Sequence, residues 1–361
     1  MIAVGLDLGN GLLKLAGPRP GDRLLVPHAL APAEGVHRDL YMLSPGEDPV
    51  QHLHAEIRAP FLDGPRQIFA GELALREYPD RVLEVEAGER KAGSDRLLLL
   101  ALTALAAAVH RTDRLTTVAR LSLAVALPMA EAADPAARQT LAARLRGRHT
   151  VRWLSTPPWD GRSLDLVVDM VDVIPEGAAA FLAMAALDPG LLDETVAVVD
   201  VGVRSVDWAI FTQGRFQPGP SGGTTDGGLA TAADRILAAA RQRHGPHVAR
   251  HRGDVLNALH EAARTGGPVV LWGLGRPYDL TDVARHELTR LARDVTRLVT
   301  EAVSRAGNVT RLLLIGGGGL LLAPYLQDSS RLPVTLADDP LWANAAGLWH
   351  RAWGRAEAVV A

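Results

Sequence analysis

One short acidic, glycine-containing sequence occurs twice in this chain. The first copy is Asp7-Leu8-Gly9-Asn10-Gly11-Leu12-Leu13-Lys14, and the second is Asp200-Val201-Gly202-Val203-Arg204-Ser205-Val206-Asp207. Each copy lies between two apolar runs, which predicts a strand, a tight turn and a second strand. Turns that contain glycine present backbone N–H groups to phosphate oxygens, and a carboxylate at a strand end can orient a metal ion or its waters. The duplication favours two similar half-molecules that share one site for a polyphosphate and a cation.

One of the few lysines of this chain lies in the first acidic hairpin. Of 38 basic residues only Lys14 and Lys91 are lysine. Lys14 belongs to the first acidic hairpin, where a compact ammonium group on a flexible stem can reach a phosphate. A solvated lysine without a ligand remains the alternative for Lys14, and more so for Lys91.

Length and composition exclude several classes of protein. The 361 residues exceed what one hydrophobic core usually needs, so we expect two lobes. The 38 basic and 41 acidic side chains nearly balance, which argues against a nucleic-acid coat and against an electrostatic membrane binder. The absence of cysteine removes disulfides and zinc-thiolate sites. With no apolar run long enough to cross a bilayer and no signal segment, the sequence predicts a soluble cytoplasmic protein.

The elements that must position the two hairpins alternate between strands and helices. In the first half we expect strands at 2–8, 12–17, 23–27, 118–127, 150–154 and 164–173, helices at 94–110 and 134–146, and a small insert at 28–93. In the second half we expect strands at 195–201, 206–213, 215–217, 269–272, 312–315 and 333–336, helices at 229–243, 281–306 and 320–327, and a final helix from 341. Such alternation predicts an α/β protein, and the hairpins make its sheets mixed.

Five motifs of the sequence resemble those of a known superfamily. The two acidic hairpins, the Pro175-Glu176 helix start, the Gly316–Gly319 turn and the helix that begins in Ala343-Asn344-Ala345-Ala346-Gly347 follow the order of the five nucleotide-site motifs of the actin, sugar-kinase and heat-shock-chaperone ATPases. Within that superfamily the chain most resembles the ParM/StbA plasmid-segregation actins and the short archaeal and bacterial actin homologues.

The resemblance implies an actin-like ATPase fold. That fold has two ribonuclease H-like lobes with mixed sheets flanked by helices, each lobe with a small inserted subdomain. Lobe I would take residues 1–194, with the insert at about 28–93 and the final helix 341–356 packed back on it. Lobe II would take residues 195–340, with a small subdomain at about 241–285.

The resemblance also implies roles for particular residues. Asp7 and Asp200 would be the metal ligands that hold magnesium through water, and Glu176 would position or activate the attacking water. The two phosphate loops would be formed by Gly9, Asn10, Gly11 and Lys14, and by Gly202, Val203, Arg204 and Ser205. The other nucleotide contacts would be Gly223, Asp226, Gly227, Gly228, Gly316, Gly317 and Gly318. The chain departs from many relatives at Val203 and Arg204, where Gly and Thr are usual; the short archaeal members are more similar here.

The function that the resemblance implies is ATP hydrolysis coupled to assembly. ATP or ADP and Mg²⁺ would be the cofactors, and the protein itself would be the partner in a homopolymer filament for plasmid segregation or cell shape. A DNA-binding adaptor protein is a further candidate partner, and neither direct nucleic-acid binding nor a membrane is expected. Two alternatives stay open on the same fold: a small-molecule kinase, and a nonpolymerising ATPase that acts as a chaperone or scaffold. For assembly contacts the regions 28–93 and 241–267 are the candidates.

Other chemical patterns in the sequence are weaker. The segment Gly219-Pro220-Ser221-Gly222-Gly223 matches the G-x-S-x-G nucleophile elbow, but no strand runs into its serine. His244, His247 and His251 have helical spacing, yet Gly245-Pro246 interrupts the helix. Neither the Walker motif nor the Rossmann fingerprint is present.

Overall fold

The computed structural model describes residues 1–36, 47–83, 89–249 and 251–360. Its contacts divide the chain into two compact units. Unit 1 consists of Met1–Pro175 and Asn344–Ala361, and unit 2 of Glu176–Ala343. Residues 37–46 and 84–88, which belong to the expected insert 28–93, lie outside the described residues.

Unit 1 is built on one mixed sheet with the strand order β3-β2-β1-β7-β9-β8-β5-β6-β4. Its strands are β1 (Ile2–Leu8), β2 (Leu12–Ala16), β3 (Leu24–Pro27), β4 (Leu30–Pro32), β5 (His54–Arg58), β6 (Arg66–Ala70), β7 (Val118–Leu127), β8 (Gly147–Trp153) and β9 (Ser163–Pro175). The central strands β1, β7 and β9 are parallel, so their carboxyl ends meet at one edge. The strands of the 28–93 region, β4, β5 and β6, continue this same sheet.

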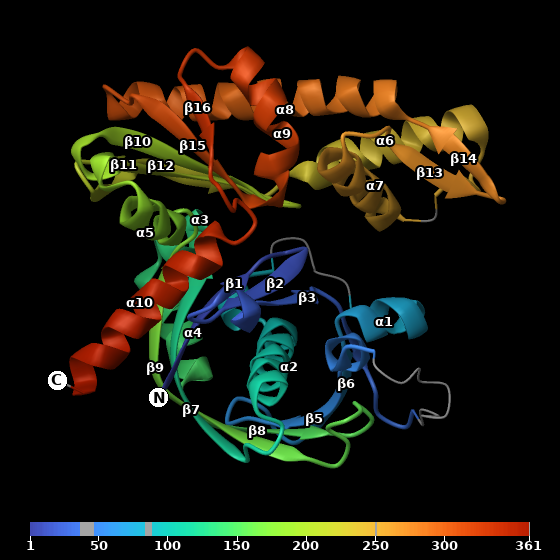
Figure 1. Ribbon diagram of the computed structural model, residues 1–361, viewed down its shortest axis with the longest axis vertical. Helices are drawn as coiled ribbons and strands as arrows, with labels where there is room; N and C mark the ends of the chain where they lie inside the picture. The colour runs from blue at the N-terminus through green and yellow to red at the C-terminus, as the bar shows by residue number, and fades with distance from the viewer. Residues whose placement is uncertain (37–46, 84–88, 250, 361) are drawn as a thin grey trace. The chain divides into compact units, whose positions relative to one another are not determined.

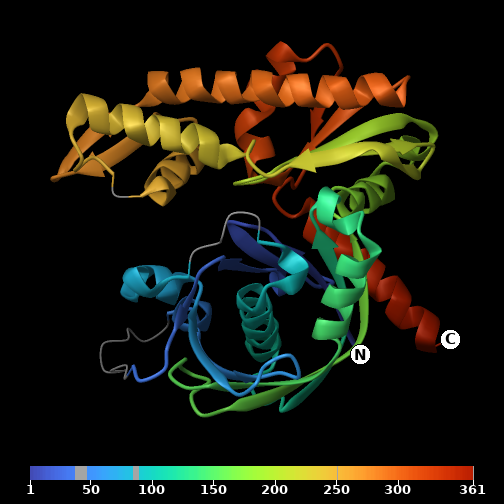
Figure 2. The same ribbon diagram turned by 180° about the vertical axis from the view of Figure 1, so that it is seen from behind.

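Helices cover the two faces of the unit 1 sheet. They are α1 (Glu72–Glu77), α2 (Asp95–Thr112), α3 (Met129–Ala132), α4 (Pro135–Leu145) and α10 (Ala343–Val360). The sheet curls around α2 (Figure 1), which explains why this helix is apolar on almost every side. Helix α10 packs on the outer face (Figure 2), so closely that a Cβ on Gly5 would lie 2.2 Å from the carbonyl oxygen of Ala345.

Unit 2 contains a five-stranded sheet, ordered β12-β11-β10-β15-β16, and the separate hairpin β13-β14. The strands are β10 (Thr195–Val201), β11 (Val206–Thr212), β12 (Arg215–Thr224), β13 (Val270–Gly273), β14 (Arg276–Asp279), β15 (Arg311–Ile315) and β16 (Val334–Leu336). The helices are α5 (Ala178–Leu187), α6 (Leu229–His244), α7 (Arg252–Thr265), α8 (Thr281–Ala306) and α9 (Gly316–Ser329). Apolar side chains of α6, α8 and α9 form one core with the sheet.

Short 3-10 turns complete the described chain. They are η1 (Pro20–Asp22), η3 (Pro49–His52), η4 (Pro79–Arg81), η5 (Lys91–Gly93) and η6 (Pro189–Asp193). The mixed sheets flanked by helices confirm the predicted α/β class. In the described residues, no helix combines the length and the hydropathy that a bilayer crossing requires.

Two local predictions were wrong, both at glycine-rich segments. Gly316–Gly319 form the first turn of α9 and not a turn before it. The helix predicted to start at Pro175-Glu176 is present, but strand β9 runs on to Pro175 and α5 begins at Ala178, so Glu176 lies in the connection between them. Strand β12 runs through Thr224 where only 215–217 was expected, because its backbone pairs with β11 and the ladder outweighs the low strand propensity of glycine and proline.

Candidate active site

The first acidic hairpin brings a carboxylate and a cation together. Strands β1 and β2 pair so that Asp7 lies opposite Lys14, and the Nζ atom of Lys14 is 2.6 Å from Oδ2 of Asp7. Asp7 is only 2% exposed. Because removing a carboxylate from water is costly unless it is paired, Lys14 stabilises the charge at this position.

The turn of the first hairpin is held by His28, a residue that sequence reasoning missed. Its backbone N–H donates to the carbonyl of Gly11 at 3.0 Å, and its ring Nδ1 donates to the carbonyl of Gly9 at 2.8 Å. Burial, together with the positive charge of Arg96, lowers the pKa of His28 to about 4, so the ring is neutral near pH 7. No spacing pattern in the sequence connects His28 with the hairpin.

Glycine is sterically required at the first position of this turn. A Cβ on Gly9 would lie 2.5 Å from the carbonyl oxygen of Leu12. Within unit 1 the structure therefore gathers the predicted residues Asp7, Gly9, Asn10, Gly11 and Lys14 into one hairpin at the carboxyl end of β1.

The second acidic hairpin has a different charge pattern. Strands β10 and β11 pair so that Asp200 lies opposite Asp207. Residues directly opposite each other in antiparallel strands point to the same face, so two carboxylates stand where the first hairpin has a carboxylate and an ammonium group. Asp207 is buried and Asp200 is half-buried.

The amino end of α6 holds the second turn. The N–H groups of Gly228, Leu229 and Ala230 donate to three successive carbonyls of that turn, at distances of 2.7–3.1 Å. These acceptors belong to Gly202, Val203 and Arg204. Only backbone carbonyls are used, so the turn is held whichever side chains occupy 203 and 204.

Two glycines of unit 2 leave room for the carboxylates of Asp200 and Asp207 directly beside the backbone. A Cβ on Gly316 would lie 2.3 Å from Oδ1 of Asp200, and one on Gly223 would lie 2.3 Å from Oδ1 of Asp207. Gly316 also has a φ of +83°, which side chains other than glycine rarely adopt. Gly318 is required as well, because its Cβ would lie 2.6 Å from the carbonyl oxygen of Val201.

The remaining predicted residues differ in their exposure and in the space around them. Glu176 is 6% exposed and follows Pro175, which pairs with Leu127 at the carboxyl ends of β9 and β7. Asp226 is exposed in the connection between β12 and α6. A Cβ on Gly317 would meet no atom closer than 3.5 Å, so glycine is not sterically required there.

The alternative sites of the sequence have structural roles instead. The Oγ of Ser221 donates to the carbonyl of Gln217 at 2.6 Å and accepts from the N–H of Ile210 at 2.9 Å, inside strand β12, which continues to Thr224 before α6 begins at Leu229. His247 bonds to the hydroxyl of Tyr278 at 2.9 Å. His251 is the N-cap of α7.

Comparison with known proteins gives consistent results for the two parts of the chain. Residues 5–178 match the family model of the N-terminal domain of actin-like proteins, and residues 198–328 match the C-terminal model of the archaeal MreB-like actin homologue. No curated protein matches the chain by sequence.

Solved structures share the whole fold at low sequence identity. Bacillus thuringiensis ParM with ATP has a TM-score of 0.77 and 18% identity over 99% of each chain. A 15-stranded ParM filament from Clostridium botulinum has a TM-score of 0.77 and 19% identity over 98% of this chain and 99% of the other. Actin-like protein Alp7A has a TM-score of 0.77 and 17% identity over 99% and 96%. The matched domains and the ParM-like fold show that this chain belongs to the actin-like proteins.

Proposed function

We propose that this protein is an actin-like ATPase that assembles into nucleotide-dependent filaments. The observation that carries the proposal is the duplicated hairpin, with Asp7 and Asp200 at equivalent strand ends of two separate sheets. Similar proteins have been solved with ATP, ADP and AMPPNP. Both hairpins would act on the same nucleotide, because phosphoryl transfer depends chiefly on positioning and charge neutralisation.

The donor groups fit a magnesium ion that keeps most of its waters. Among the described residues no three His, Cys, Asp or Glu side chains form a group that could hold a metal. Magnesium commonly binds through one or two carboxylates plus water and substrate phosphates. Asp200, with Asp207 beside it, would hold the hydrated ion, and Asp7 would contribute from the first hairpin. When bound, the ion would neutralise charge on the phosphates.

Lys14 and Glu176 would have different tasks. Lys14 lies opposite Asp7 in the first hairpin, where its ammonium group could contact a phosphate oxygen. Glu176 follows strand β9 and precedes Gly177, the residue before α5, which has a φ of +80°. A carboxylate in this position would orient the attacking water and accept its proton.

Nucleotide contacts would come mainly from the backbone. The phosphate loops Gly9–Gly11 and Gly202–Ser205 would offer backbone N–H groups to the polyphosphate, other than the N–H of Gly202, which donates to the carbonyl of Ser205 at 2.9 Å. Gly223, Asp226, Gly227 and Gly228 would approach the ribose and phosphates, and Gly316, Gly317 and Gly318 the adenosine. The amino end of α9 adds the positive end of a helix dipole to this region.

Self-assembly is the proposed consequence of hydrolysis. A relative forms a 15-stranded filament, and an open polymer results when one surface of a subunit binds a different surface of the next. Segregation of plasmid DNA through an adaptor protein is the cellular role that we propose for such a filament.

The test is hydrolysis and sedimentation of the purified protein with ATP, ADP or AMPPNP, each with magnesium or with EDTA. We expect magnesium-dependent ATP turnover and pelleting with ATP. Glu176→Gln should bind ATP like the parent, hydrolyse it about 10- to 1,000-fold more slowly, and give longer-lived filaments. ATP turnover without pelleting at any nucleotide would favour the kinase or scaffold alternatives, and no ATP binding would contradict the proposal.

A further inference from the structure

The β13-β14 hairpin of unit 2 exposes two large apolar side chains. Trp272, in strand β13, is 69% exposed, and Leu274, on the two-residue turn formed by Leu274 and Gly275, is 78% exposed. Neighbouring residues anchor the hairpin firmly, since Leu271 is buried and a Cβ on Gly273 would lie 2.4 Å from the carbonyl oxygen of His247. We call Trp272 and Leu274 the hairpin tip.

The backbone of the hairpin tip makes its leucine unusual. Leu274 has a φ of +50° and Gly275 a φ of +72°, the pattern of a type I′ turn. Asn-Gly or Asp-Gly usually occupies such a turn, because a branched apolar side chain is strained there. In the single chain the exposed Leu274 side chain gains no burial that would offset this backbone strain. Burial of the side chain in a partner would offset it.

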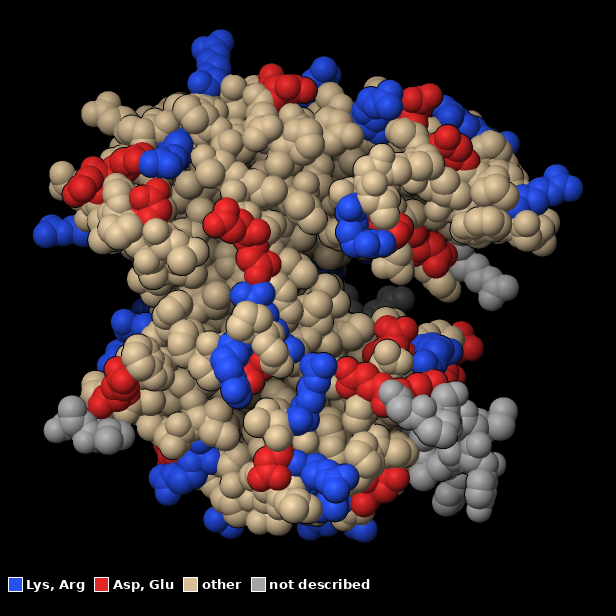
Figure 3. Space-filling view, in the orientation of Figure 1, with Lys and Arg blue, Asp and Glu red and all other residues tan. Residues whose placement is uncertain are grey.

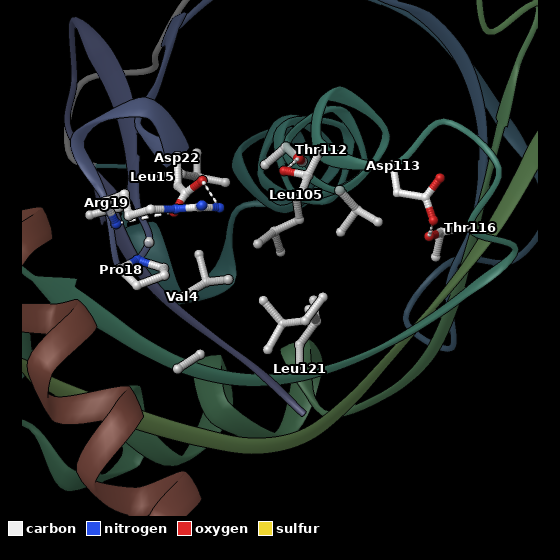
Figure 4. Close-up of a pocket in the computed structure, with 16 residues that line it drawn as sticks. Val4, Leu15, Pro18, Arg19, Asp22, Leu105, Thr112, Asp113, Thr116 and Leu121 are labelled. Carbon is white, nitrogen blue, oxygen red and sulfur yellow. Dashed lines mark hydrogen bonds and ion pairs between the residues drawn. The ribbon is translucent and has the colours of Figure 1, made fainter.

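Unit 1 has an apolar pocket of about 230 Å³ that could accept such a tip. It lies between α2 and the amino ends of β1 and β7, at the opposite end of β1 from Asp7. Figure 4 shows Val4, Leu105 and Leu121 pointing into the pocket, with the Arg19–Asp22 and Asp113–Thr116 pairs on opposite sides of it.

The rim of the pocket is itself apolar and exposed. Ile2, which lines the pocket, is 46% exposed, while Leu115 and Val118 from the adjoining loop and strand are 65% and 51% exposed. The Asp113 carboxylate is exposed beside these residues, and the exposed cation Arg276 follows the tip after Gly275. Both surfaces are thus apolar, and Asp113 would pair with Arg276, because the cation on the other side of the pocket, Arg19, is already paired with Asp22.

We propose that the hairpin tip of one copy of this chain inserts into the α2–β1 pocket of a second copy. The inference deepens the proposed function, on which it rests, by naming a contact of the filament. Because the tip and the pocket are different surfaces of the same molecule, the contact is heterologous, and repeating it extends the assembly instead of closing a dimer. The anchored hairpin is already ordered, so little conformational entropy is lost on docking.

The first experiment changes the tip without weakening the fold. Leu274→Asn suits the type I′ turn, so its thermal unfolding temperature should equal or exceed that of the parent. Its critical concentration for pelleting with ATP should rise about tenfold or more, as should that of Trp272→Ala, because buried aromatic and aliphatic anchors dominate interfaces. Leu187→Asn is the matched control: Leu187 is 79% exposed on α5, outside the proposed contact, and its substitution should not change pelleting.

The second experiment uses the absence of cysteine from the chain. Leu274→Cys and Leu115→Cys proteins, each prepared alone and then mixed with ATP under mild oxidation, should form a disulfide-linked heterodimer. Leu187→Cys mixed with Leu115→Cys should not.

The outcomes separate this inference from the proposed function. If the parent pellets with ATP but Leu274→Asn and Trp272→Ala pellet equally well and no Leu274–Leu115 link forms, the tip contact is wrong and the filament proposal stands. If the parent stays monomeric with every nucleotide and no link forms, both are wrong.

Discussion

The two acidic hairpins share a backbone plan but differ in what stands opposite their aspartates. Asp7 faces Lys14 at 2.6 Å, whereas Asp200 faces Asp207. The first hairpin therefore pairs its aspartate with a cation, and the second places two carboxylates side by side. Under the proposed function this difference would give the hairpins separate tasks, the first facing a phosphate anion and the second a hydrated metal ion.

The turns of the two hairpins are also held by different means. In unit 1 one residue, His28, bonds to the turn through both its backbone N–H and its neutral ring, whereas in unit 2 three backbone N–H groups at the start of α6 do so. A turn held by backbone depends little on side-chain identity. This explains how the second turn accommodates Val203 and Arg204 where relatives carry smaller residues.

The largest effect should come from removing either strand-end carboxylate. Asp7→Asn and Asp200→Asn should each lower ATP turnover at saturating magnesium by about 100-fold or more, because under the proposed function both charges would position the same reacting group. Asp200→Asn should also shift the magnesium dependence of turnover more than Asp7→Asn does, because Asp200 has a second carboxylate opposite it whereas Asp7 is paired with Lys14. Steady-state kinetics across magnesium concentrations measures both effects. Asp193→Asn, an exposed carboxylate on η6, is the control, and equal magnesium shifts in both variants would contradict the division of tasks.

A smaller effect, on stability, should come from adding a methyl group beside the Asp200 carboxylate. Gly316→Ala should destabilise the protein by about 3 kcal/mol, because the new methyl group meets the Asp200 carboxylate and the φ of +83° disfavours alanine. Urea unfolding measures the change. The control is Gly253→Ala in helix α7, where a Cβ meets no atom within 4 Å and alanine favours the helix. A stability of Gly316→Ala equal to that of the parent would mean that the Asp200 carboxylate moves away at little cost.

Changing the residue opposite each aspartate should alter the free energy of unfolding in opposite directions. Lys14→Ala leaves the buried Asp7 without its ammonium partner and should lower the free energy of unfolding by about 2 kcal/mol. Asp207→Asn removes one of two facing carboxylates and should raise stability slightly in magnesium-free buffer, by about 0.5 kcal/mol. Thermal unfolding with EDTA tests both. A destabilised Asp207→Asn would show that the second pair is not repulsive in the free protein.

A pH dependence of stability is expected at the first hairpin. The pKa of His28 is lowered from 6.5 to about 4 in the folded chain, chiefly by burial, so the unfolded chain binds more protons between these values. The contribution of His28 is thus complete above about pH 6.5 and is lost as the pH falls toward 4, by about 1–2 kcal/mol after allowing for partial solvent screening. Comparing parent and His28→Asn by urea unfolding from pH 4 to 7 measures this contribution. Equal slopes in the two proteins would contradict it.

Surface charge gives no comparable contrast. On the face shown in Figure 3, acidic and basic side chains are interspersed, in keeping with a formal net charge of −3. We therefore expect the partner specificity of this protein to come from apolar contacts such as the hairpin tip more than from long-range charge.

The sequence by itself determined the elements that depend on local periodicity. Strand 118–127 and helix 281–306 were predicted with the bounds that the structure has, because a buried apolar run and a 3.6-residue period are local signals. The α/β class followed from the alternation of such elements. The duplicated Asp-x-Gly hairpins were also readable, since strand, turn and carboxylate are adjacent in sequence.

Tertiary structure alone decided what lies against those hairpins. The pairing of β11 with β12 kept Gly219–Thr224 extended, although glycine and proline predict a loop. His28 reaches Gly9 across 19 residues, and Gly316 meets Asp200 across 116, so no local pattern could reveal either contact. Likewise Gly5 reads as an ordinary strand residue until α10 packs on it. The physical reason is that hydrogen bonds and close backbone approaches between distant segments depend on chain packing, which sequence periodicity does not encode.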